Sequence, residues 1–228
     1  GILTLQPPAS VIPGVGGNVA GGQTVINQGT LKMAGGNNTI YFNNFLSLNQ
    51  GGTLDLNGTA QTSRLFDVGA VVNAGGTLTG SAGSTFVENL DGLNRNFSGI
   101  ITGAVAFQKA GANNTLSLFS DSNTTGDILI AAGTTQLRDS ARFSGTTNLD
   151  INYGVLTLDN NGGTINDNDR INNAAAIDLR GGTISYIGRA QTASTETLGA
   201  VKADQGASTI TVATGGTGVN SADLTLTS

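Results

Sequence analysis

The sequence of 228 residues contains no cysteine, histidine or tryptophan. Without Cys or His, the chain cannot form a Ser-His-Asp or Cys-His nucleophile, a thiolate or imidazole zinc site, or the usual ligands of haem and iron–sulfur clusters. Glutamate is also scarce, because Glu88 and Glu196 are the only two in the sequence. These absences favour a structural protein over an enzyme, and we expect no catalytic residue, no cofactor and no metal site.

Charged residues make up 11% of the chain, against about 25% in typical domains. The three lysines, Lys32, Lys109 and Lys202, are isolated, and the seven arginines are scattered. Because no basic stripe exists, we do not expect nucleic acid as a partner. No apolar run reaches the ~18–20 residues of a transmembrane helix, so we expect no membrane span. Asn, Thr, Ser, Asp and Gln must provide most of the polar surface.

What the sequence does contain is a repeated phrase of the form Gly-x-(Leu/Ile)-x-apolar. Clear copies of this phrase occupy residues 1–5, 29–33, 52–56, 154–158 and 182–186, and degenerate copies occupy 76–80, 114–118, 133–137, 163–165 and 223–226. Glycine permits a sharp corner, and apolar residues two apart face the same side of a strand. Each phrase therefore predicts a turn followed by a short strand.

The repeat predicts an all-β fold, a parallel β-solenoid with about 20–24 residues per rung. An antiparallel meander is the alternative, because Asn-Gly pairs also occur in two-residue hairpins. We expect a single elongated domain over residues 1–228. Two interruptions are predicted, a Pro-rich loop at 6–14 and an irregular insertion at 88–98.

Some phrases match a known family in wording as well as in period. Residues 107–118, 124–126 and 133–137 resemble the autotransporter-associated β-strand repeat, and 168–186, 192–201 and 208–212 are similar to its continuation in large bacterial surface proteins. The resemblance covers residues 100–228 well and 1–99 only in style. It implies a right-handed parallel β-helix in the stalk of a secreted or surface-displayed protein that serves in adhesion, autoaggregation or as a spacer.

The chain begins inside one such phrase and stops just after another, which leaves unpaired solenoid edges at both ends. We therefore expect a segment of a longer chain, or a subunit that associates with itself end to end or laterally. The expected function is an extracellular structural or adhesive segment at the bacterial cell surface, with cell-surface polysaccharide as a further candidate partner. The alternatives are a glycan- or receptor-binding fibre and a polysaccharide-active β-helix enzyme.

Asp167 and Asp169 lie two residues apart and could form a Ca²⁺ pair. The simpler interpretation is a solvated corner loop, because the spacing of known calcium motifs is missing. For a glycosidase, adjacent rungs could supply two carboxylates ~5–9.5 Å apart. Asp55, Asp150, Asp159 and Asp178, however, fall in or beside repeated strand phrases, where outward polar positions are expected anyway.

Aromatic and lysine side chains raise two more possibilities. Six aromatic residues could form a sugar-stacking strip, although stacking in the core is the simpler interpretation: Tyr41, Phe42, Phe45, Phe119, Tyr153 and Tyr186. The lysines stand near Asn and Asp, which suggests a Lys–Asn isopeptide bond. Such a bond needs a nearby buried carboxylate and is usual in immunoglobulin-like folds, so we do not expect it here.

Overall fold

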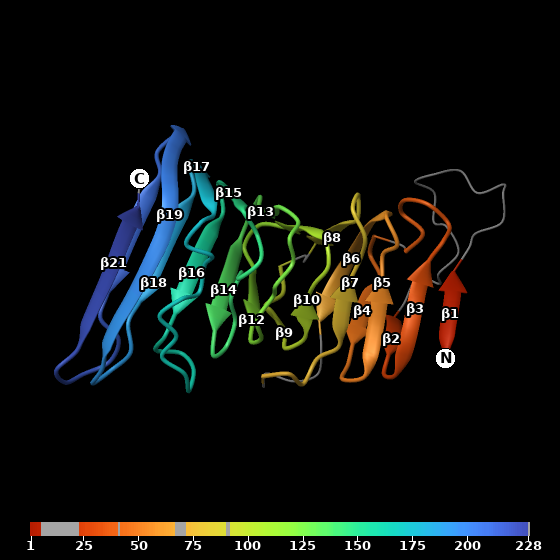
Figure 1. Cartoon of the computed structure of the whole chain (residues 1–228), viewed down its shortest axis with the longest axis horizontal. Helices are drawn as coiled ribbons and strands as arrows, with labels where there is room; N and C mark the ends of the chain where they lie inside the picture. Colours follow the sequence, from red (N-terminus) through yellow and green to blue (C-terminus); the bar gives the residue numbers. More distant parts are fainter. Residues whose placement is uncertain (6–22, 41, 67–71, 90–91, 228) are drawn as a thin grey trace.

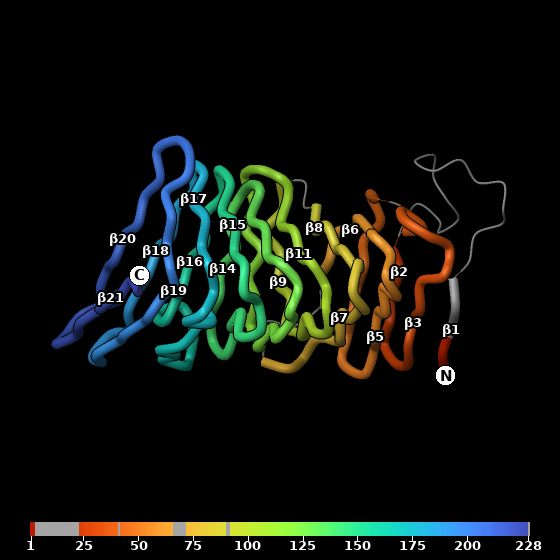
Figure 2. The backbone as a smooth tube through the Cα atoms, turned by 45° about the horizontal axis from the view of Figure 1, so that its top comes forward, coloured from red at the N-terminus to blue at the C-terminus, as the bar shows by residue number. Residues whose placement is uncertain are grey.

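A computed structural model describes residues 1–5, 23–40, 42–66, 72–89 and 92–227. The described chain is all-β and winds into a parallel β-solenoid of about nine turns, with β1 and β21 at opposite ends (Figure 1). Every ladder between named strands is parallel, so the antiparallel meander is wrong. The tube view shows successive turns stacked along one axis (Figure 2).

The strands form three sheets, each ordered along the solenoid axis. The five-stranded sheet contains β1 (Ile2–Leu5), β3 (Gly29–Met33), β5 (Gly52–Asp55), β7 (Thr77–Thr79) and β10 (Ile100–Ile101). The ten-stranded sheet contains β2 (Gln23–Ile26), β4 (Phe45–Leu48), β6 (Ala60–Phe66), β8 (Thr85–Asn89), β11 (Ala106–Ala110), β13 (Ile128–Ile130), β15 (Asn148–Asn152), β17 (Ala176–Arg180), β19 (Ala193–Gln205) and β21 (Ser221–Thr227). The six-stranded sheet contains β9 (Arg95–Phe97), β12 (Thr115–Leu118), β14 (Thr134–Arg138), β16 (Val155–Asp159), β18 (Thr183–Ile187) and β20 (Thr209–Ala213).

Two long strands each pair with different neighbours along their length. The first half of β6 pairs with β8, and its second half pairs with β4. Similarly, β19 pairs with β21 through its first residues and with β17 through Val201 and the residues that follow. These two strands join what would otherwise be separate ladders into the ten-stranded sheet.

The repeated phrases become register partners, which explains why the sequence repeats at all. Gly29, Thr30 and Leu31 lie opposite Gly52, Thr53 and Leu54 in the next turn. Their inward side chains stack into columns such as Leu118, Leu137, Leu158 and Tyr186, all nearly inaccessible to solvent. Stacked apolar columns of this kind remove their surface from water and supply the main favourable term for folding.

The length of a turn varies more than the sequence suggested. Thr115 and Thr134 are register partners 19 residues apart, whereas Val155 and Thr183 are 28 apart. The extra residues form a loop at 160–170 that contains no strand. The strand expected at 163–165 is therefore wrong, and Ile165 is 38% exposed. The Pro-rich segment 6–14 lies outside the described residues. The segment 88–98 contains the end of β8 and all of β9.

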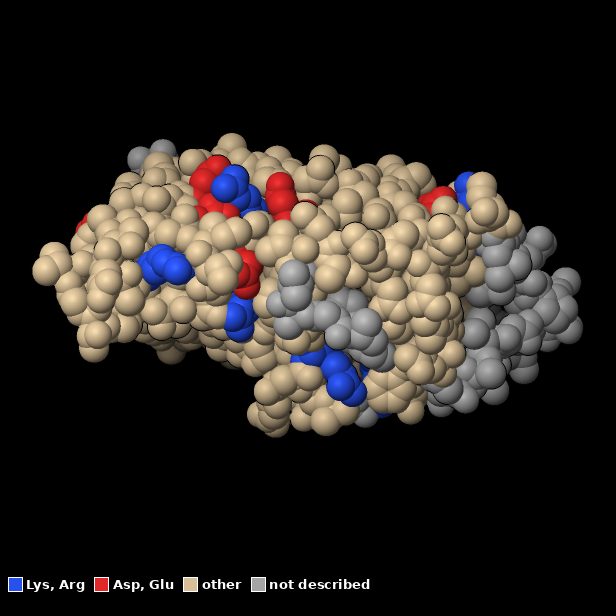
Figure 3. Space-filling view, turned by 90° about the horizontal axis from the view of Figure 1, so that it is seen from below, with Lys and Arg blue, Asp and Glu red and all other residues tan. Residues whose placement is uncertain are grey.

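Polar side chains form ladders between turns, some of identical and some of mixed residues, and Thr30, Thr53 and Thr77 are successive register partners. The Asn49 side-chain amide donates to Asn27 Oδ1 at 2.7 Å. A mixed ladder runs from Ser117 to Gln136 at 2.8 Å and from Gln136 to Asp159 at 2.7 Å. Charged groups are sparse on the side of the solenoid shown in Figure 3. The described residues form no helix long and apolar enough to cross a membrane.

Candidate functional site

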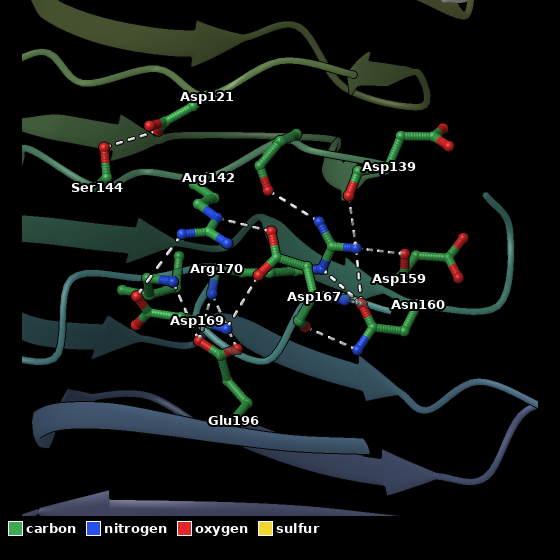
Figure 4. A network of polar contacts seen from close by, with 12 residues as sticks. Asp121, Asp139, Arg142, Ser144, Asp159, Asn160, Asp167, Asp169, Arg170 and Glu196 are labelled. Atoms are coloured by element: carbon green, nitrogen blue, oxygen red, sulfur yellow. Dashed lines mark hydrogen bonds and ion pairs between the residues drawn. The ribbon is translucent and has the colours of Figure 1, made fainter. Parts of the chain in front are cut away.

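The densest polar cluster lies where the loop 160–170 packs on the neighbouring turns (Figure 4). At its centre is the fully buried Arg170. Its guanidinium donates to Asn160 Oδ1 at 2.6 and 2.9 Å, to the Ala141 carbonyl at 2.8 Å, and to the carbonyls of Asp139 and Asp159 at 3.2 and 3.1 Å. Arginine suits this place because its planar fork offers five donors, and here each partner is an oxygen of a surrounding turn.

Glu196 closes the other side of this cluster. Its carboxylate accepts hydrogen bonds from the backbone N–H groups of Arg170 and Ile171, with all donor–acceptor distances at 3.0 Å. The side chain is 1% exposed, and burial raises its pKa to about 7. The two backbone donors and the charge of Arg170 oppose this increase, while the nearby Asp167 adds to it. Burial dominates because it removes the charged form from water.

Asp167 and Asp169 lie beside the same arginine but differ in their exposure to solvent. Asp167 is buried, and its carboxylate accepts from Arg142 Nε at 2.7 Å, whereas Asp169 is exposed and 3.8 Å from Arg142 Nη1. An arginine thus holds the place that a cation would take between the two carboxylates. In the part of the chain that is described, no three residues of the His, Cys, Asp or Glu types are grouped to hold a metal ion.

The other aspartates predicted from the repeat have different surroundings. Asp55 pairs with Lys32 at 3.7 Å on the surface, and Asp159 is buried as an acceptor for the loop that follows it. Asp150 and Asp178 are register partners in adjacent turns. Asp178 also lies 3.9 Å from Arg180 Nη2. Of these four aspartates, the structure therefore places Asp150 and Asp178 opposite each other on adjacent turns, while Asp55 and Asp159 lie in other sheets.

The aromatic side chains divide between core and surface. Tyr186 and Phe119 are buried, Phe42 is 53% exposed, and Tyr41 lies outside the described residues. Phe45 lies under the guanidinium of Arg64, 4.8 Å from its ring centroid. The five described residues therefore do not form a continuous strip.

Tyr153 is the exposed aromatic residue with the most distinctive setting. It is 68% exposed and lines an open groove of about 490 Å³. Amides and hydroxyls form much of the remaining wall, from Asn94, Asn113, Thr115 and Thr134. A ring beside neutral hydrogen-bonding groups is the chemistry that carbohydrate surfaces require.

Sequence reasoning missed the buried charges at Arg170, Glu196, Lys109 and Glu88. A pattern in the sequence could have revealed two of these buried charges, Glu88 and Lys109. Glu88 follows Phe86 by two residues, and Lys109 follows Phe107 by two, so each charged side chain shares the inward side of its strand with a core phenylalanine. The position of Arg170 had no comparable signal, because it depends on how the irregular loop folds back.

Comparison with known proteins gives no match from which a function could be assigned. No protein-family model matches the chain, and neither a curated protein nor a solved structure is significantly similar to it.

Proposed function

We propose that this chain is a structural and adhesive segment of an extracellular β-solenoid, which extends as a stalk or self-associating fibre at a bacterial cell surface. The resemblance of residues 100–228 to autotransporter-associated repeats supports the location. The scarcity of charged and reactive side chains supports a mechanical role. The two most elaborate polar clusters are buried, which suits them to holding turns together.

The observation that carries the proposal is an open core at the end formed by β20 and β21. Ile184 and Tyr186 are fully buried, yet their register partners Ile210 and Val212 are 37% and 46% exposed. Both strands are also the last members of their sheets. The apolar column and the backbone ladder therefore end at a surface that matches another turn of the same kind. Strand addition at such an edge supplies backbone hydrogen bonds and covers apolar side chains together.

The test is self-association of the purified chain, measured by light scattering across a concentration series and by electron microscopy. We expect elongated assemblies whose length increases with concentration. Ile210→Lys with Val212→Lys should return the chain to monomers, because charges would enter the apolar end face. Thr211→Lys is the matched control, since Thr211 faces outward between them, and it should leave assembly unchanged. A monomer at all concentrations would contradict self-association and leave a stalk within one longer chain.

A glycan-binding fibre is the second candidate, favoured by the groove at Tyr153. The aromatic ring would stack on a sugar face, and the amides and hydroxyls of the wall would bond to its hydroxyl groups. Tyr153 has a φ of 57°, a conformation that Asn tolerates better than most residues. Tyr153→Asn should therefore abolish binding to neutral polysaccharide without disturbing the turn. Phe42→Asn removes an exposed ring elsewhere and should have no effect. Titration calorimetry against a panel of neutral polysaccharides measures the difference.

Our proposal includes no catalytic activity. Asp150 and Asp178 lie opposite each other on adjacent turns, the placement that the enzymatic alternative would use, so this pair provides the check. Release of reducing ends from polysaccharide by the wild-type chain, and its loss in Asp150→Asn, would replace the structural proposal with the enzymatic one.

A further inference from the structure

Three side chains with complementary chemistry meet inside the solenoid near the start of β12. Lys109 and Glu88 are fully buried, and Asn114 is 4% exposed. Lys109 and Glu88 are register partners in β11 and β8, so their side chains leave the sheet on the same inward side one turn apart. Asn114 follows Lys109 by five residues, across the corner that leads into β12. A lysine, an asparagine and a glutamate are thus brought together in a water-poor interior.

The lysine amine is held tightly against the asparagine side chain. Lys109 Nζ lies 2.6 Å from Asn114 Oδ1, 2.7 Å from the Ala110 carbonyl oxygen, 3.0 Å from that of Gly111 and 3.4 Å from that of Ala132. Since a carbonyl bond adds only ~1.2 Å, the Asn114 Cγ atom is at most about 3.8 Å from Nζ. Reacting atoms in near-attack arrangements are ~3–3.5 Å apart, so little movement separates this geometry from attack.

The surrounding backbone restricts where the amine can go. A Cβ atom at Gly133 would lie 3.0 Å from Nζ and 2.7 Å from the carbonyl oxygens of both Asn114 and Gly111. The absence of a side chain there lets the adjacent turn close over the amine. These close contacts fix the orientation of Lys109, and its side chain is fully buried, two conditions that favour an intramolecular reaction over hydrolysis.

The electrostatic setting favours a reactive amine. Burial lowers the pKa of Lys109, and the charge of Glu88 opposes this change. A lowered pKa increases the share of neutral amine, which is the nucleophilic form. A carboxyl group one turn away can take a proton from the amine and return it to a leaving group.

We propose that Lys109 and Asn114 form an intramolecular isopeptide bond with the help of Glu88. Lys109 Nζ attacks Asn114 Cγ, and a new C–N bond forms. The bond from Cγ to Nδ2 then breaks, and Nδ2 leaves as ammonia with the proton that Glu88 has carried from the lysine. The reaction needs no oxidant or other reagent, and its only by-product is one ammonia molecule. The product is a covalent brace across the corner between β11 and β12.

Intact-mass measurement of the purified full chain tests this bond. The folded protein should weigh about 17 Da less than its sequence, the mass of one ammonia. Trypsin should fail to cut after Lys109 in the denatured protein, and the peptide of residues 96–138 should give no fragment ions from breaks between 109 and 114. A mass equal to that of the sequence, with normal cleavage after Lys109, would show that the lysine remains a hydrogen-bonded ammonium and would overturn the proposal.

Variants separate the isopeptide from an asparagine succinimide, which also loses ammonia. Lys109→Arg retains the charge and the donors but has no attacking amine, so its mass should equal that of its sequence. Asn113→Gly alters the neighbouring asparagine, whose φ of 59° glycine accepts, and should retain the loss. Glu88→Gln should slow or abolish the loss of ammonia. A loss of ammonia that persists in Lys109→Arg would exclude the isopeptide bond. If Lys109→Arg does not fold, the peptide map of the wild type still decides.

Discussion

Glu196 binds the backbone of Arg170 and not its charged end. Both carboxylate oxygens lie 3.0 Å from the Arg170 backbone nitrogen, while the guanidinium hydrogen bonds run to Asn160 and to carbonyls of earlier turns. The two buried charges therefore stabilise different neighbours. Removing either one should have a separate consequence.

The stability of the chain should depend on pH through Glu196. Its pKa rises from the ordinary 4.5 to about 7 on folding, so the folded state binds this proton more tightly than the unfolded state. The free energy of unfolding should be greatest below pH 4.5, fall by up to about 3 kcal/mol between pH 4.5 and 7, and stay constant above pH 7 with respect to this group. Because the chain has no histidine, no imidazole titrates in this window.

Denaturant unfolding at pH 5, 6, 7 and 8 measures this dependence. Glu196→Gln keeps an acceptor oxygen for the backbone donors but cannot titrate, so its stability should change little over the same range. Equal pH dependence in the two proteins would contradict the assignment to Glu196.

Arg170→Met should destabilise the solenoid strongly. The substitution removes two of the donors to Asn160 Oδ1 and the arginine donors to three buried carbonyls, and changes of this kind cost ~3–5 kcal/mol. Arg180→Met is the matched control, because Arg180 is 38% exposed in its side chain and pairs only with surface carboxylates. The control should shift the free energy of unfolding by less than ~1 kcal/mol. Comparable losses in both variants would contradict the central role of Arg170.

Stacked like charges should weaken the outer face. Asp150 lies opposite Asp178 in the neighbouring turn, and like charges placed directly opposite each other repel. Asp150→Asn should therefore stabilise the chain by ~0.2–1 kcal/mol at low salt, and added salt should remove the gain. Asp55→Asn, by contrast, removes a partner of Lys32 and should give no gain. Thermal unfolding at two salt concentrations distinguishes the two variants.

Close contact between turns should make one glycine hard to replace. A Cβ atom at Gly126 would lie 2.2 Å from the Val105 carbonyl oxygen, inside the backbone of the previous turn. Gly126→Ala should therefore destabilise the chain by at least ~1–3 kcal/mol through forced separation of the turns. Gly36 has open space around it, so Gly36→Asn, which suits its φ of 83°, should be tolerated. Equal melting temperatures for the two variants would contradict this account.

The fold could be predicted well from the sequence because each turn of a solenoid repeats the same local structure. The Gly-Thr-Leu phrases at β3, β5 and β7 indicate both the corner and the side of the strand that faces the core, and they do pair with one another. The loop 160–170 could not be predicted in this way, because its shape depends on hydrogen bonds that its residues donate to Asp139, Ala141 and Glu196 in other turns. The same holds for Lys109 and Glu88, whose meeting depends on the stacking of two turns.

The buried charges also bear on which turn stacks on which. Turns that share nearly the same Gly-Thr-Leu phrase could pair with the wrong neighbour during folding, at little cost to the apolar columns. Such a slip would separate Glu88 from Lys109, or Glu196 from the backbone donors of Arg170 and Ile171, and would leave a buried carboxylate uncompensated. The buried charges thus destabilise misaligned stackings and help to specify the register of the turns, much as a single buried polar residue sets the alignment of a coiled coil.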